Sequence, residues 1–167
     1  SPARPGGEVL TLVTPDADDV LSIGSVVSGA HMTKNGYGTL VLSGNNTFTG
    51  TVTVNRGALR ADDGTGLPSG GSGANLRFGG GVLETSGTFN RTLGSSAGEV
   101  RWDGQSSGGF AAHGGALDIQ LNGGTASVTW DSTGSFVQGH RKLVFGSVNA
   151  NNIVDFQNDL GLGSFDR

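Results

Sequence analysis

Short apolar runs, each followed by turn-forming residues, limit most strongly what this chain can fold into. The runs hold four or five residues, are rich in β-branched side chains, and are followed by Gly, Asn, Asp or Ser. No helical period extends beyond about one turn, so the pattern predicts an all-β protein. The expected strands are Val9–Val13, Val20–Ile23, Thr39–Leu42, Thr51–Val54, Ala58–Ala61, Asn75–Phe78, Gly81–Glu84, Glu99–Trp102, Leu117–Leu121, Ser127–Trp130, Lys142–Phe145 and Ile153–Phe156.

Apolar and polar residues alternate within these strands, which predicts one buried face and one exposed face. Leu117, Ile119 and Leu121 form the longest such row, with Asp118 and Gln120 between them. Two architectures satisfy the alternation: a β-solenoid of stacked parallel strands and an antiparallel β-sandwich. Similar units that recur along the chain favour the solenoid, because repeats that cannot bury their own faces must stack on their neighbours.

The composition restricts the function classes. Glycine supplies 32 of 167 residues, yet there are only 4 prolines and no Gly-X-Y period, so collagen is excluded. A net charge of −4 gives no basic surface for nucleic acid or for an anionic membrane, and the absence of cysteine removes disulfides and thiolate chemistry. No apolar run approaches 18 residues, so we expect no membrane insertion by this segment.

The expected organisation is one β-solenoid segment over residues 9–167, preceded by a linker or the start of an excerpt over residues 1–8. No signal peptide is recognisable at the start, and the apolar alternation before Phe165 is cut short. We therefore interpret the sequence as an excerpt whose export signal lies elsewhere.

One stretch carries a family resemblance. Residues Thr33-Lys-Asn-Gly-Tyr-Gly-Thr-Leu-Val-Leu-Ser-Gly-Asn-Asn-Thr-Phe-Thr-Gly50, and then Thr51 to Leu59, resemble the autotransporter-associated β-strand repeat. Phe48 stands where that repeat usually has tyrosine, and Thr51 follows Gly50 directly where a second glycine is common. The resemblance implies a right-handed parallel β-helix, secreted or displayed on Gram-negative-type bacteria, often as an autotransporter passenger.

The residues of this stretch, read by their physical properties, agree with that fold and give expectations for single positions. Inward-pointing side chains would be Leu40, Leu42, Val52, Val54 and Leu59, and Ser43 to Asn46 would form a corner. We hypothesise that Asn45 and Asn46 stack on equivalent residues of adjacent coils and hydrogen-bond through their amides. The resemblance implies no catalysis.

A search for chemistry assigns no catalytic residue, no cofactor and no metal. The carboxylates in or beside strands are read as turn and surface residues; they are Glu84, Glu99, Asp103, Asp118, Asp131 and Asp155, with pairs at Asp18-Asp19 and Asp62-Asp63. Asp103 and Asp131 each follow a tryptophan, so the pattern allows equivalent positions on successive coils.

Metal and sugar sites are weighed in the same way. Asp16 to Asp19 could bind calcium weakly but lacks a calcium-loop pattern, and His31, His113 and His140 have no metal-ligand spacing. Trp102, Trp130, Phe110 and Phe136 would form a sugar platform if exposed, but the alternation favours core packing. Asn45-Asn-Thr47 and Asn90-Arg-Thr92 match the N-glycosylation triplet and are read as turns.

Three functions follow from these observations. The first is a structural, non-enzymatic segment that stacks on neighbouring coils of its own chain, or end to end on identical chains to form a fibre. The second is an adhesin-type module that binds a surface glycan or matrix. The third is a carbohydrate-active β-helix enzyme, which would need converging carboxylates. In each case the expected location is extracellular or on the cell surface, with an outer-membrane-associated parent.

Overall fold

A computed structural model describes residues 9–104 and 106–163, so the expected linker over residues 1–8 lies outside the described residues. The described residues form strands joined by turns, with no helix and hence none fit to cross a membrane. The strands are β1 (Val9–Val13), β2 (Val20–Ile23), β3 (His31–Asn35), β4 (Thr39–Leu42), β5 (Thr51–Val54), β6 (Ala58–Arg60), β7 (Asn75–Phe78), β8 (Val82–Arg91), β9 (Val100–Trp102), β10 (Gly108–Leu121), β11 (Val128–Thr129), β12 (Leu143–Phe145), β13 (Val154–Phe156) and β14 (Leu160–Gly161).

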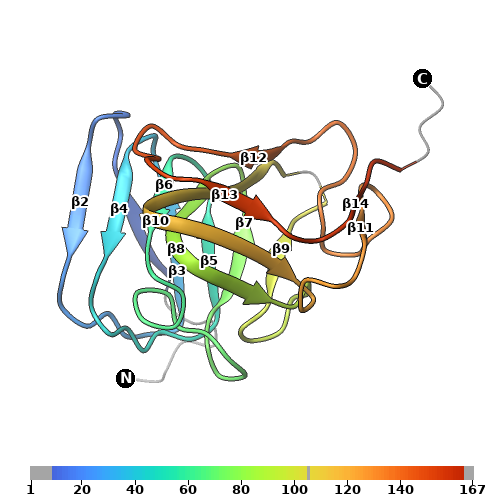
Figure 1. Cartoon of the computed structure of the whole chain (residues 1–167). Helices are drawn as coiled ribbons and strands as arrows, with labels where there is room; N and C mark the ends of the chain where they lie inside the picture. The colour runs from blue at the N-terminus through green and yellow to red at the C-terminus, as the bar shows by residue number, and fades with distance from the viewer. Residues whose placement is uncertain (1–8, 105, 164–167) are drawn as a thin grey trace.

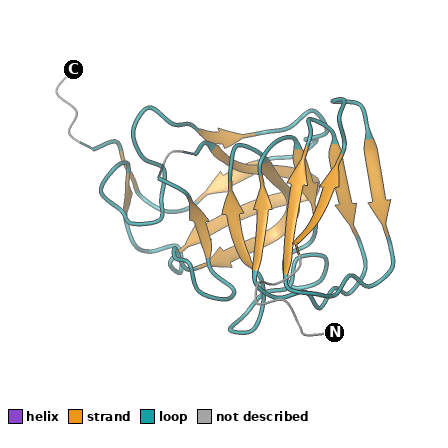
Figure 2. Ribbon diagram, turned by 180° about the vertical axis from the view of Figure 1, so that it is seen from behind, coloured by secondary structure: helices purple, strands orange, loops and turns teal. Residues whose placement is uncertain are grey.

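The strands stack in parallel on successive turns of the chain. The first sheet has the order β1-β3-β5-β7-β9 and the second β12-β10-β8-β6-β4-β2, with β13 also on β10. A third, two-stranded sheet pairs β11 with β14. Every strand pair is parallel, and the strands lie side by side along the molecule (Figures 1 and 2). Because a sandwich of hairpins requires antiparallel pairs, the sandwich alternative is wrong, and the chain is a parallel β-helix.

The coils are defined by their strands. The first coil holds β1, β2 and residues 24–30; the second holds β3, β4 and 43–50; the third holds β5, β6 and 61–74. The fourth holds β7, β8 and 92–99, and the fifth holds β9, β10 and 122–127. Coil length grows along the chain. Hydrogen-bonded partners on adjacent coils are 19 residues apart for Val27 and Asn46 but 37 apart for Leu121 and Asn158.

Two rows of inward-facing side chains form the core. The register places Leu10, Met32, Val52, Leu76 and Val100 in one row, and Leu21, Leu40, Leu59, Leu83 and Phe110 in the other. All members are buried except the first of each row. The predicted inward positions Leu40, Leu42, Val52, Val54 and Leu59 are therefore confirmed.

Glycines at the corner between the two sheets let the coils approach closely. Ala58 N donates to Gly38 O at 3.1 Å, and Val82 N donates to Gly57 O at 3.0 Å. A Cβ atom on Gly57, whose φ is 62°, would lie 2.3 Å from Gly38 O. A side chain at this position would both strain the backbone and separate the coils.

A second corner is turned inside strands. Both β8 and β10 run past it, and their register shifts between Ala112 and Leu117, where β10 bends (Figure 1). Before this corner β8 pairs with both β6 and β10, and beyond it β8 pairs with β10. The sequence predicted only the short strands Gly81–Glu84 and Leu117–Leu121 here, and no strand over residues 108–116.

The connection from β12 to β13 forms a strap over the outer side of the second sheet. In Figure 1 it runs back toward β4, and Asn149 Nδ2 donates to Thr39 Oγ1 at 3.0 Å, 110 residues away in sequence. The outward-facing side chains of Ala58, Val82 and Ala111 are buried in a cluster with Val144, at the start of the strap. The outer face of this sheet is thus partly covered and apolar, whereas alternation predicted a polar exposed face.

Candidate functional site

The residues that resemble the passenger repeat build the second and third coils and hold them to their neighbours. Asn46 is buried; its Oδ1 accepts from Val27 N at 2.7 Å on the first coil, and its Nδ2 donates to Gly66 O at 2.8 Å on the third. Asn45 is exposed. The hypothesis of stacked amides at Asn45 and Asn46 is therefore wrong, because Asn46 bonds to backbone groups of the adjacent coils. An amide ladder is present instead between Asn35 and Asn55, whose side chains are 2.8 Å apart.

Lys34 lies in the interior of the second coil. Its side chain is fully buried between Leu12 and Val54 in the register, and its Nζ donates to the carbonyl oxygens of Asn35 and Gly36 at 2.8 and 2.9 Å. A third, longer bond of 3.3 Å reaches Arg56 O on the third coil. Burial lowers the pKa of Lys34 from 10.5 to about 8.

The first coil is open on its outer side. Within the described residues β1 pairs only with β3, and β2 only with β4, so each keeps one unpaired edge. Leu10 and Leu21, the first members of the two core rows, are 44% and 36% exposed. Apolar side chains beside unpaired strand edges form a surface that accepts another strand.

Residues 32–61 match the family model of the passenger-associated-transport-repeat. This match supports the resemblance to an autotransporter passenger repeat, and the family implies a secreted or surface-exposed parent protein. No curated protein and no solved structure gave a match.

C-terminal to the passenger repeat, the aromatic residues form part of the core. Trp102, Phe110 and Phe136 are buried, and Trp102 packs on Phe78 and Phe136 with ring centroids 4.8 and 5.3 Å apart. Trp130 is half-buried against Phe136. The predicted core packing is confirmed, and these side chains do not form an exposed sugar platform.

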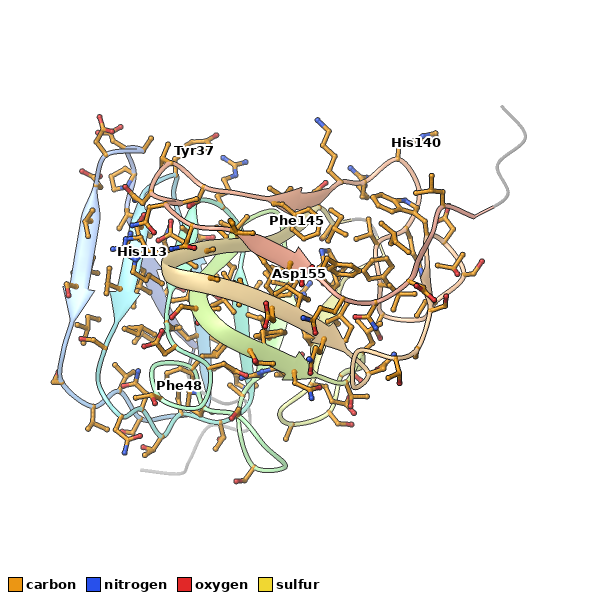
Figure 3. The ribbon with its side chains drawn as sticks, in the orientation of Figure 1. Tyr37, Phe48, His113, His140, Phe145 and Asp155 are labelled. Atoms are coloured by element: carbon orange, nitrogen blue, oxygen red, sulfur yellow. The ribbon has the colours of Figure 1, made fainter. Side chains whose placement is uncertain are left out.

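Most of the carboxylates have a local partner. Glu84 pairs with Arg60, Asp63 pairs with Arg91, and Asp103 contacts both Arg77 and Arg101. Glu99 accepts from Ser96 N. On the outer side of β10, Asp118 lies beside Asp155 in the register; Figure 3 labels Asp155 there.

The expected equivalence of Asp103 and Asp131 is wrong. Trp102 N donates to Ser135 O, so residues beyond Asp131 cover β9. Asp131 itself has a φ of 61° and accepts a hydrogen bond from Gly139 N. The two aspartates therefore end their strands in different surroundings.

The candidate metal residues do not gather. Asp19 Oδ2 accepts from Asp16 N at 2.9 Å, which closes a turn within Asp16 to Asp19. His31 Nδ1 accepts from Thr51 N at 3.0 Å, while His113 and His140 lie far apart in Figure 3. Over residues 9–104 and 106–163, no group of three or more His, Cys, Asp or Glu side chains is close enough to hold a metal ion.

A groove of about 300 Å³ lies at the second corner and crosses four coils. Its polar side chains come from the second coil through the fifth; they are Ser43, Arg60, Asp62, Thr65, Thr85, Ser86 and His113. Figure 3 shows His113 at the bend of β10. Beside the groove, the fully buried Glu84 accepts from Arg60 Nε at 2.7 Å through Oε2, and its Oε1 has no partner among the described residues.

Sequence reasoning missed this groove and its ion pair. Arg60 and Glu84 are 24 residues apart, and only the strand register places them side by side. The signal in the sequence is the outward position of each residue within an alternating strand. These outward positions predict the Arg60–Glu84 contact only when the lengths of the third and fourth coils are known.

Proposed function

We propose that this chain is a non-enzymatic structural segment of a passenger-type β-helix, located outside the cell, that is extended by stacking a further coil on its first coil. The observation that carries the proposal is that β1 and β2 each keep an open edge among the described residues, with Leu10 and Leu21 exposed beside these edges. The match to the passenger-associated-transport-repeat supports a structural role.

The two ends of the stack differ, and this gives the proposal a direction. At the other end β12 and β13 have three residues each and β14 has two. Residues 130–141 cover β9 without forming a strand that pairs with it, and they bury Phe136 and Val137. Short and irregular edges discourage strand addition, so the stacking end is the first coil.

When the chain is isolated, a second molecule of the same chain supplies the coil that stacks on its first coil. Two copies would meet through their first coils and stop at a dimer, because the same surface is used on both sides. This proposal replaces a growing fibre with a closed pair. In a longer polypeptide, residues before the segment would supply the coil instead.

Sedimentation velocity between about 5 and 500 µM tests the proposal. We expect a concentration-dependent shift from monomer to dimer. The double substitution L10K/L21K should abolish the shift, since it places two charges on the contact. The matched control V148K/I153K changes two exposed apolar residues outside the first coil and should leave the shift intact.

Two results from sedimentation would overturn the proposal. One is a wild-type chain that stays monomeric over the whole range. The other is association that is lost in V148K/I153K but kept in L10K/L21K. Filaments seen by electron microscopy would also contradict it, because they require a contact that does not close.

A further inference from the structure

The groove at the second corner has free hydrogen-bonding groups. Within the described residues, the side chains of Ser43, Asp62, Thr65, Ser86 and His113 make no hydrogen bond or ion pair. They include donors and acceptors from four successive coils, and all of them line the same hollow. A ligand with many hydroxyl groups matches such a set, because each hydroxyl both donates and accepts.

The charges that line the groove argue against an anionic ligand. The guanidinium of Arg60 is already paired with the buried carboxylate of Glu84, and Asp62 adds an unpaired negative charge at the rim. Val41 and Ala61 contribute apolar surface between the polar groups. This mixture suits the C–H and O–H groups of a neutral sugar better than a phosphate or a uronate.

The spacing of the coils adds a length criterion. Adjacent parallel strands lie about 4.8 Å apart, which is close to the advance per sugar in an extended, β-1,4-linked chain. An oligosaccharide along the groove would therefore place successive sugar units against successive coils. A helically coiled glycan would lose this match after the first units.

We infer that this groove, which runs from Ser43 to His113 across four coils, binds an extended neutral oligosaccharide with about one sugar unit per coil. The inference is independent of stacking through the first coil, because no groove residue belongs to β1 or β2. In this arrangement Ser86 of β8, on the fourth coil, and His113 of β10, on the fifth coil, each contact the bound oligosaccharide.

Calorimetric titration with β-1,4-linked oligomers of glucose and of N-acetylglucosamine, from two to six units long, tests the inference. We expect the affinity to rise about tenfold from the dimer to the tetramer and to change little beyond it. α-1,4-Linked glucose oligomers of the same lengths should bind at least about tenfold more weakly than the β-1,4-linked tetramer. A tetramer of galacturonate serves as the anionic comparison.

Paired substitutions locate the site. S86A/H113A should weaken binding of the preferred tetramer by about tenfold, through the loss of two side-chain contacts. The matched control S132A/H140A removes the same residue types at exposed positions outside the groove and should bind like the wild type. Equal urea midpoints for the two variants establish that both are folded. If S86A/H113A unfolds, the substitution T65V at the exposed rim takes its place.

The inference is overturned if neither β-1,4-linked series binds at concentrations up to about 10 mM. It is also overturned if only the galacturonate tetramer binds, if affinity does not depend on length, or if S132A/H140A weakens binding as much as S86A/H113A does.

Discussion

At the scale of single residues, polar side chains in the interior lie where the coiled backbone leaves groups to be satisfied. Lys34 occupies an inward position of β3, and its ammonium group bonds to carbonyl oxygens at the corner of the second and third coils. Such bonds offset part of the cost of burying the charge. The remaining cost appears as the lowered pKa of Lys34.

This lowered pKa predicts a pH dependence of stability. Between about pH 8 and pH 10.5 the unfolded chain holds a proton on Lys34 that the folded chain has lost. The contribution of Lys34 to the free energy of unfolding should therefore rise with pH in this window, by at most about 3 kcal/mol, and be constant below pH 8. Urea unfolding of the wild type and K34M at several pH values from 7 to 10.5 measures the difference.

The wild type should gain stability relative to K34M across the window, whereas the exposed-site control K142M should follow the wild type. A difference between wild type and K34M that stays constant from pH 7 to 10.5 would mean that the carbonyl bonds keep Lys34 charged, contrary to this prediction.

At the scale of elements, one side of the coil formed by the passenger repeat contains no strand. Residues 43–50 connect β4 to β5. Their backbone N–H groups bond to adjacent coils, for example from Thr47 N to Val27 O at 3.0 Å and from Asn46 N to Thr65 O at 3.1 Å. The side chain of Asn46 supplies a bond to each neighbouring coil. This amide therefore adds two side-chain bonds to the backbone bonds that hold the segment against its neighbours.

Replacement of Asn46 by alanine should lower the free energy of unfolding by about 2 to 4 kcal/mol, because Val27 N and Gly66 O lose their partner and Gly66 is buried. Asn45→Ala is the matched control, since Asn45 is exposed, and should change the free energy by less than about 0.5 kcal/mol. Urea unfolding followed by circular dichroism measures both. Equal losses for the two variants would contradict the role given to Asn46.

The sequence predicted most elements and few of the contacts between them. Alternation located β4, β5 and β7 with their bounds, because their inward residues are all apolar. It missed β3, since the buried Lys34 interrupts the apolar pattern, and it placed no strand over the glycine-rich first half of β10. The Arg60–Glu84 pair and the groove were not predictable, because unequal coil lengths hide which residues become neighbours.

At the scale of the whole molecule, the two ends of the β-helix are unlike. The first coil presents strands of five and four residues with one edge free, while the other end has short strands and the irregular cover over β9. A strap fixes the opposite end back onto the second coil through Asn149 and Thr39. Growth of the stack is therefore expected at the first coil.

Hydrogen exchange of backbone amides as a function of protein concentration tests this claim most directly. The account predicts that amides on the free edges of β1 and β2 become protected as concentration rises, while those of β12 and β13 do not change. Protection that appears at β12 and β13, with β1 and β2 still exchanging freely, would contradict it.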